Sequence, residues 1–299
     1  MKINIQFGDS IHEISFSNYD IAFVGEPIDD RGNAAINYIN TNVASVIFLN
    51  YVPGEFEIQI NDNQVPVDDL ENNLPQLNDS NVLIDATTIG FVELLLLLQL
   101  LFDINNHNFS ILYIEPASYS KRQRNSLLHF RDFDLSIQTK GYEAVPGHAL
   151  TIDNEVHQKV VFLCGFEAER MDRVIEDSEI ISKRCKCIFG LPAFKPGWEM
   201  DSFANNIHIM KAKDMMRDID FCGATNPMAV FDKLSTTYQG LDEDDQLFVV
   251  PLATKPMSIG ACLFLASKPK NKVAVLYDHP QKKTGRGIDV GKWHLYNIT

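Results

Sequence analysis

Several local signatures of common enzyme classes are missing from this sequence. It contains neither G-x-G-x-x-G nor G-x-x-x-x-G-K-[ST], so the dinucleotide fingerprint and the P-loop are absent. The segments H-E-x-x-H and G-x-S-x-G are absent as well. These absences remove several enzyme classes whose chemistry depends on such local motifs.

Basic residues are scarce, since 26 Lys and Arg stand against 40 Asp and Glu, a net charge of −14. A polyphosphate backbone repels such a chain, so we expect no binding of long DNA or RNA. A basic cluster at Lys121–Arg131 is the exception, read as a solvated helix face or as a rim that attracts an anion. A local pocket for a small anionic ligand remains compatible with the overall charge.

The sequence also contains few cysteines and no long apolar run. The five cysteines stand mostly in apolar contexts, which predicts reduced thiols in a cytoplasmic protein. Cys185-Lys186-Cys187 lacks a second Cys/His pair at zinc-finger spacing, so no metal is expected there. The most apolar run, Phe91–Phe102, is too short to span a bilayer and predicts a core helix. No secretion signal is recognised at the start, and no membrane partner is expected.

Two stretches of the chain share one pattern. Phe248–Pro280 reads as a buried strand, a polar turn, a small-residue helix and a second buried strand. Leu83–Pro116 repeats this order, with an Ala-Thr-Thr turn in place of Ala-Thr-Lys-Pro-Met. A turn between a parallel strand and a helix is the usual place for a ligand-facing loop.

Four landmarks recur in the same order in both halves, which predicts an internal duplication. They are a strand ending in glycine followed by an acid and arginine, a strand followed by Pro-Gly, the Ala-Thr turn, and a strand ending near an acid and proline. Their positions are Gly25 with Asp30-Arg31, Pro53-Gly54, Ala86-Thr87 and Glu115-Pro116, then Gly165 with Glu169-Arg170, Pro196-Gly197, Ala253-Thr254 and Asp278-His279-Pro280.

Alternating strands and helices predict an α/β fold with mainly parallel sheets. We expect two Rossmann-like lobes, residues 1–116 and 155–299, joined by a connecting segment, 117–154. Alternation in Lys2–Phe7 and His12–Phe16 predicts an added β-hairpin, and Lys292–Ile298 predicts an edge strand. Asn226-Pro227 is typical of a helix start, with Asn as the N-cap.

The repeated turns supply the candidate ligand-binding residues. Hydroxyl and backbone N–H groups at a helix start bind anions, and a lysine adds positive charge. The alternative is that the threonines only cap their own helices. Two arginines would clamp phosphate or form surface ion pairs, and two glycines allow close backbone approach. The candidates are Thr87, Thr88, Thr254, Lys255, Arg31, Arg170, Gly25 and Gly165.

Three carboxylates at strand ends are candidates for catalysis. Asp85, Glu115 and Asp278 follow predicted parallel strands, where carboxylates suit Mg²⁺. They would serve a metal-dependent phosphodiesterase or other hydrolase acting on a nucleotide. A strand-end aspartate that caps a helix is the alternative for Asp85. A binding protein would need no cofactor.

The turns Ala86-Thr87-Thr88-Ile89-Gly90 and Ala253-Thr254-Lys255-Pro256-Met257 resemble those of the Rossmann-like sensor domains called CARF and their tandem relatives called SAVED. The first turn departs from the pattern because it lacks the lysine. The resemblance covers the repeated parts of both halves. It implies a nucleotide-derived ligand, of the kind these families read in prokaryotic antiviral defence.

Three functions follow as hypotheses. The first is a ligand sensor or adaptor whose inter-lobe cleft takes a small anionic, nucleotide-like ligand, with a separate effector protein. The second is the metal-dependent phosphodiesterase or hydrolase. The third is a structural subunit of a larger assembly. Turnover of the ligand separates the first two.

Overall fold

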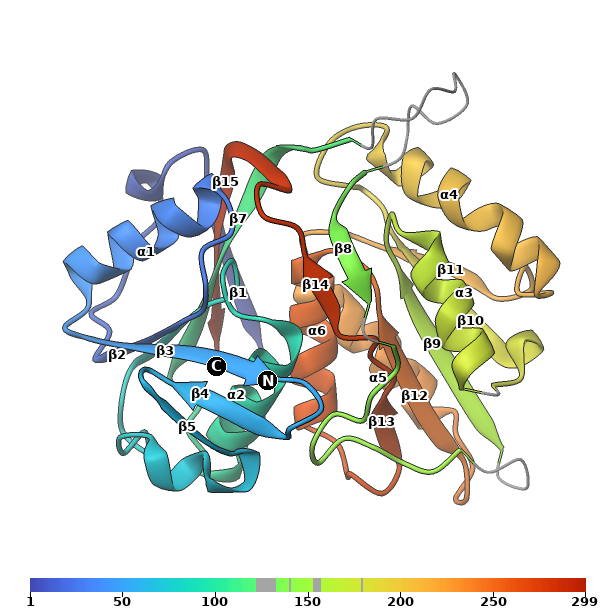
Figure 1. The fold of residues 1–299 in the computed structure, drawn as a ribbon, viewed down its shortest axis with the longest axis horizontal. Coiled ribbons are helices and arrows are strands. Elements are labelled where there is room, and N and C mark those ends of the chain that lie inside the picture. Colours follow the sequence, from blue (N-terminus) through green and yellow to red (C-terminus); the bar gives the residue numbers. More distant parts are fainter. Residues whose placement is uncertain (122–132, 140, 153–156, 179) are drawn as a thin grey trace. The chain divides into compact units, whose positions relative to one another are not determined.

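The computed structural model describes residues 1–121, 133–139, 141–152, 157–178 and 180–299 (Figure 1). Of the basic cluster predicted at Lys121–Arg131, only Lys121 belongs to the described residues. The chain divides into unit 1, Met1–Ser120 with Lys283–Thr299, and unit 2, Lys121–Lys282. Residues 283–299, expected in the C-terminal lobe, therefore lie with the N-terminal one. Both units combine helices with a sheet, as an α/β fold requires.

Unit 1 is built on an eight-stranded sheet with the order β1-β15-β7-β6-β2-β3-β4-β5. The four strands β7, β6, β2 and β3 run parallel, and antiparallel pairs extend the sheet on both sides. The elements are β1 (Ile3–Gly8), β2 (Ile21–Val24), α1 (Asp30–Asn42), β3 (Ser45–Val52), β4 (Glu57–Ile60), β5 (Asn63–Pro66), β6 (Val82–Asp85), α2 (Phe91–Asp103), β7 (Phe109–Tyr119) and β15 (Gly287–Ile298), with 3-10 turns at Ile11–Glu13, Val67–Asp69 and Glu71–Asn73.

The core of unit 1 follows from its uninterrupted apolar runs. Strand β2 is buried at every residue, as expected for a parallel strand covered on both faces. Helix α1 packs Ala35 and Ile39 against Val24, Leu83 and other strand residues. Helix α2 is buried on nearly all sides, which confirms the predicted core helix.

The hairpin predicted at the N-terminus is wrong. Strand β1 pairs antiparallel with β15, from Ile3 opposite Ile298 to Gly8 opposite Trp293. The expected second strand begins instead with a 3-10 turn, in which Glu13 accepts hydrogen bonds from the Asp9 N–H and the Ser10 hydroxyl. Ser-x-x-Glu spacing favours such a helical turn. The C-terminal strand is correspondingly interior, between β1 and β7.

Unit 2 contains a five-stranded, fully parallel sheet with the order β11-β10-β9-β12-β13. Helices α3 and α4 share a core cluster with one face of this sheet, and α5 packs against α6. A small antiparallel pair, β8 and β14, completes the unit. The elements are β8 (Ser136–Thr139), β9 (Gln158–Cys164), α3 (Ala168–Asp177), β10 (Cys185–Gly190), α4 (Trp198–Ala212), β11 (Ile219–Cys222), α5 (Pro227–Gln239), β12 (Gln246–Pro251), α6 (Lys255–Ala266), β13 (Val273–Val275) and β14 (Pro280–Lys282), with a 3-10 turn at Ser182–Arg184.

Four parallel strands have the same order in both units. In unit 1 they run β3-β2-β6-β7, and in unit 2 they run β10-β9-β12-β13. Thr87 follows β6 and Thr254 follows β12, so both threonines stand after the third of the four strands along the chain. Strand β11 is additional in unit 2, at the edge beside β10.

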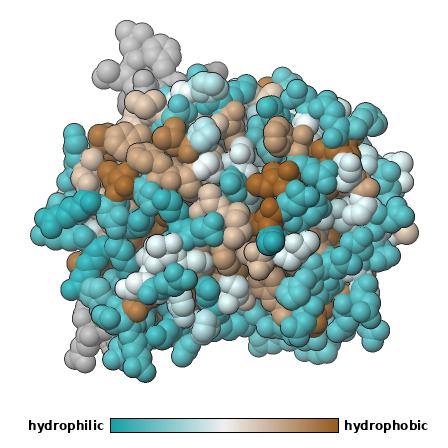
Figure 2. All heavy atoms as spheres, turned by 180° about the vertical axis from the view of Figure 1, so that it is seen from behind, coloured by the Kyte–Doolittle hydropathy of each residue, from teal (hydrophilic) through white to brown (hydrophobic). Residues whose placement is uncertain are grey.

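The surface seen in Figure 2 is mainly hydrophilic, with separate apolar patches. Large apolar residues that are exposed include Phe7, Phe56, Met200 and Phe221. In the described part of the chain, every helix falls short of the length and apolar content that crossing a membrane requires. The five cysteines are buried and free of disulfides.

Candidate functional site

The sheet of unit 2 has a topological switch point between β9 and β12. The chain leaves β9 towards β10 on one side, while β12 and β13 lie on the other. Ligands of open α/β sheets bind in the crevice at the carboxyl ends of the strands at this point. Two predicted residues are found there, because Gly165 follows β9 and Thr254 precedes α6.

A small cavity of about 20 Å³ lies at this end of the sheet. Its size is close to the space that one water molecule needs. The lining comes from the ends of β9 and β10, the loop after β11, and the starts of α4 and α6. The lining residues include Gly165, Gly190, Trp198, Ser202, Thr254 and Met257.

The start of α6 combines several groups suited to an anion. Lys255 is its first residue and is half-buried, and Pro256 occupies the second position. Thr254 stands at the N-cap, but its hydroxyl donates to the carbonyl oxygen of Ala224 at 2.9 Å. It makes no side-chain hydrogen bond to the helix. The helix-cap alternative for Thr254 therefore lacks its hydrogen bond, and the N-terminal N–H groups are not capped by this side chain.

An aromatic cluster adjoins the cavity. Phe166 and Trp198 have ring centroids 5.9 Å apart in a perpendicular arrangement, and Phe133 contacts both at 4.6 and 5.3 Å. Such edge-to-face pairs are favourable beyond the area they bury. The ammonium of Lys195 lies 5.8 Å from the Trp198 ring centroid. Local sequence pattern does not reveal this cluster, because its three rings come from separate segments of the chain.

The predicted glycines serve close contacts inside each unit. A Cβ at Gly165 would collide with the carbonyl oxygen of Leu252, the residue after β12. A Cβ at Gly25 would lie 2.9 Å from the backbone of Thr88. In both units the residue after the first parallel strand therefore packs against the turn that follows the third. The carbonyl oxygen of Gly165 also accepts hydrogen bonds from Ser202 and Asn206 of α4.

The unit 1 turn residues form a closed hydrogen-bond network. The carboxylate of Asp85 accepts from the Thr87 N–H at 2.9 Å and from the Thr88 hydroxyl at 2.7 Å. The Thr88 hydroxyl accepts from the Gly25 N–H, and the Thr87 hydroxyl accepts from the Ile114 N–H. Asp85 is fully buried. These groups join β2, β6 and β7, while α2 begins later, after Gly90.

Arg31 is buried and Arg170 is partly buried, and each pairs with a carboxylate of its own unit. Arg31 forms an ion pair with Asp29 at 2.6 Å and donates to the carbonyl oxygen of Ile114. Arg170 forms a bidentate pair with Asp278, at 2.8 and 2.6 Å, and also faces Glu167. Arg31, near the start of α1, thus reaches Ile114 in the middle of β7, and Arg170, near the start of α3, reaches Asp278 in the segment after β13.

Hydrogen bonds and ion pairs within each unit hold the charged side chains in place. Burial lowers the pKa of Arg170, but its hydrogen bonds and charge interaction with Asp278 outweigh that effect and raise the pKa above the usual value. The third candidate carboxylate, Glu115, lies 2.7 Å from Nε2 of His294, and both are buried. Asp85, Glu115 and Asp278 are therefore each engaged by protein donors; the first two belong to unit 1 and the third to unit 2.

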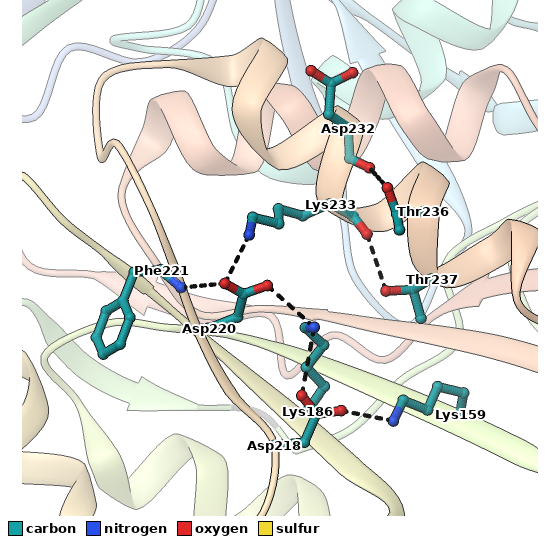
Figure 3. Close-up of polar contacts among 9 residues, drawn as sticks. All are labelled: Lys159, Lys186, Asp218, Asp220, Phe221, Asp232, Lys233, Thr236 and Thr237. Atoms are coloured by element: carbon teal, nitrogen blue, oxygen red, sulfur yellow. Dashed lines mark hydrogen bonds and ion pairs between the residues drawn. The ribbon is translucent and has the colours of Figure 1, made fainter.

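A larger groove, of about 770 Å³, lies at the opposite end of the unit 2 sheet. Lys159 and Lys186 stand near the starts of β9 and β10, and Lys233 comes from α5 (Figure 3). Asp218 pairs with Lys159 and Lys186, and Asp220 pairs with Lys186 and Lys233, at 2.7 to 3.4 Å. The sequence did not indicate this groove, because its charges come from four separate segments.

The charges in the groove neutralise one another. Burial raises the pKa of Asp220, but Lys233, the Phe221 N–H and Lys186 outweigh it and lower the pKa to about 2. Burial lowers the pKa of Lys186, but the two aspartates raise it overall. This arrangement ties three strands to α5, as a network of partly exposed ion pairs.

Among the residues that the structure describes, no three His, Cys, Asp or Glu side chains are grouped so as to hold a metal ion. Comparisons of the chain with protein-family models, with curated proteins and with solved structures find no match.

Proposed function

We propose that unit 2 binds a small anionic, nucleotide-derived ligand at the start of α6, and that the protein acts as a ligand sensor or adaptor. One observation carries this proposal. Gly165 and Thr254, both chosen from sequence pattern, line one cavity at the switch point of a parallel sheet. The positive end of the α6 dipole favours an anion there, and Lys255, as the first residue of α6, adds positive charge to this end of the helix.

The aromatic residues favour a ligand that also carries a flat ring. Phe166 and Trp198 line the cavity beside Thr254. Because the cavity has room for about one water molecule, a nucleotide would bind at its rim, with the phosphate at the start of α6 and the base near Trp198, where aromatic side chains stack on nucleobases. The resemblance of the turn to nucleotide-sensing domains agrees with this ligand class. An effector activity would then belong to a separate protein.

We also infer that the two units derive from one duplicated Rossmann-like unit. The shared strand order supports this, as do the two glycines that pack against equivalent turns. Arg31 and Arg170 add support, because each comes from the first helix after the first parallel strand of its unit and bonds the fourth strand or the segment after it. The ligand site in a cleft between the two lobes stays a prediction.

Binding is favoured over hydrolysis by the state of the candidate carboxylates. Asp85, Glu115 and Asp278 are buried, and each already accepts hydrogen bonds or forms an ion pair within its own unit. A Mg²⁺ ion would have to displace these protein donors before it could bind water and a phosphate.

The substitution Lys255→Ala tests the proposed site. Native mass spectrometry identifies any small molecule that co-purifies, and titration calorimetry with mononucleotides and cyclic oligonucleotides measures affinity. Loss of one charge-assisted contact, about 1.5–3 kcal/mol, weakens binding roughly ten- to hundredfold. The fold should persist, because lysine is seldom fully buried.

The control is Lys211→Ala, which removes an exposed lysine from α4 of the same unit. It should leave affinity unchanged. Equal affinities for Lys255→Ala and the native protein would remove Lys255 from the site. A large fall in melting temperature for Lys255→Ala would show a structural role instead.

A further inference from the structure

Among the residues that the structure describes, strand β1 forms one edge of the unit 1 sheet and pairs with β15 on one side only. Lys2 and Thr299 exchange both backbone hydrogen bonds, at 2.6 and 3.0 Å. In an antiparallel ladder, such pairs alternate with pairs that make no hydrogen bond. The N–H and C=O groups of Ile3, Ile5 and Phe7 therefore point away from β15.

This edge lacks the usual protection against pairing with another chain. Protected edges carry charges, prolines or bulges. From Ile3 to Gly8 the sequence INIQFG has no charged residue and no proline, and Phe7 is 61% exposed. Strand β5, at the other edge of the same sheet, ends in Pro66.

The edge strand β11 of unit 2 shows the contrast. The carbonyl oxygens of Asp218 and Cys222 accept hydrogen bonds from β10 and the residue after it. The backbone N–H and C=O groups of Phe221 therefore point away from β10. Its N–H donates to the carboxylate of Asp220 at 2.8 Å. The Asp220 carboxylate thus accepts from the backbone N–H that a second strand would need for pairing. Strand β1 has no carboxylate from Ile3 to Phe7 that could do the same.

Strand β1 is also complementary to itself. When two copies run antiparallel about a two-fold axis at Ile5, Ile5 lies opposite the partner's Ile5, and Ile3 lies opposite the partner's Phe7. Asn4 then lies opposite the partner's Gln6. Apolar residues meet apolar residues on one face, where Ile3 and Phe7 form a favourable pair of a β-branched and an aromatic residue. Amides meet amides on the other face, where Oε1 of Gln6 also accepts from the Ser15 N–H. In this register the outward N–H and C=O groups of one copy lie opposite those of the other, so that they can form hydrogen bonds.

We propose that β1 pairs with β1 of a second copy of this chain in this register, so that two unit 1 sheets form one continuous sheet. The interface is isologous, as in most two-fold dimers. A net charge of −14 on each chain opposes association, and the contact itself is made by an uncharged strand. Added salt should therefore strengthen the dimer.

Sedimentation equilibrium of the untagged full chain and of variants at residue 5 tests this pairing. The native protein should sediment as a dimer at tens of micromolar. Ile5→Lys places two ammonium groups opposite each other at the two-fold axis, and Ile5→Glu places two carboxylates there. Each variant alone should lose at least tenfold in dimer affinity, because like charges directly opposite are destabilising. An equimolar mixture should recover the dimer, since Lys then faces Glu.

The controls separate pairing from misfolding. Ile5 is half-buried, so the melting temperature of each variant is measured. If Ile5→Lys does not fold, Ile5→Pro replaces it, because the N–H at this position points away from β15 and an edge proline is tolerated there. Phe221→Lys, on the protected edge, should leave the dimer intact. A monomeric native protein overturns the proposal, as does a dimer that Ile5→Lys or Ile5→Pro leaves unchanged.

Discussion

Gly165→Ala is expected to destabilise the protein by about 3 kcal/mol or more, or to prevent folding. The new Cβ would overlap the carbonyl oxygen of Leu252, which belongs to the backbone after β12. A rotamer change cannot relieve a clash between two backbones, so β9 and β12 must move apart. Urea unfolding measured by circular dichroism gives the change in the free energy of unfolding.

The matched control is Gly223→Ala in the loop after β11. There the nearest atom to a new Cβ is the Cβ of Asn226, at 3.6 Å, an ordinary contact. This variant should change the free energy of unfolding by less than about 0.5 kcal/mol. Equal stabilities of the two variants would show that the close contact between Gly165 and Leu252 is not required for stability.

Arg170→Met should cost about 3–5 kcal/mol of stability. Asp278 is only 2% exposed, and it receives two hydrogen bonds from the guanidinium of Arg170. The methionine leaves that carboxylate buried without its cation. Urea unfolding of the double variant Arg170→Met/Asp278→Leu should recover much of the loss, because it removes both charges together.

The exposed pair Arg217–Asp214 provides the control for this prediction. Its side chains are 67% and 47% exposed, and Nη2 lies 3.1 Å from Oδ2. Arg217→Met should cost at most about 1 kcal/mol, since water solvates both groups. If Arg170→Met cost no more than Arg217→Met, the buried pair would not anchor α3 to the segment after β13.

The elements that sequence predicted well are those with strong local signals. Ile21–Val24 and Phe248–Pro251 are continuous apolar runs, and both are buried parallel strands. Asn226 caps α5 and accepts from the Ala229 N–H, with Pro227 at the first helical position, as expected. Local composition is sufficient here because burial on both faces and helix capping each leave their own residue pattern.

Features that depend on distant segments escaped prediction. Strand β1 finds its partner at the other end of the chain, and local alternation cannot reveal this pairing. Strand β11 carries Asp220 in its short sequence, where the charge belongs to an ion-pair network and hides the strand signal. The order of four parallel strands that the two units share became visible only in the sheets.

The place of the Thr254 turn, between a strand and a helix, was predicted from the sequence, but its hydrogen bonds were not. The turn at Thr254 lies at the switch point, where a strand followed by a helix start suggested it. Its hydroxyl, however, bonds Ala224 in another loop, and the rings of Phe133 and Phe166 join Trp198 from separate segments. Such contacts depend on strand order, which the sequence leaves open.

The most direct test of the ligand-binding proposal is a crystal structure grown with the nucleotide that binds most tightly in the titration. We predict phosphate density at the start of α6, within hydrogen-bond distance of Thr254 or Lys255, with the base near Trp198. Density in the groove around Lys159 and Lys233 would contradict the proposed site. So would the absence of bound nucleotide at concentrations well above the measured dissociation constant.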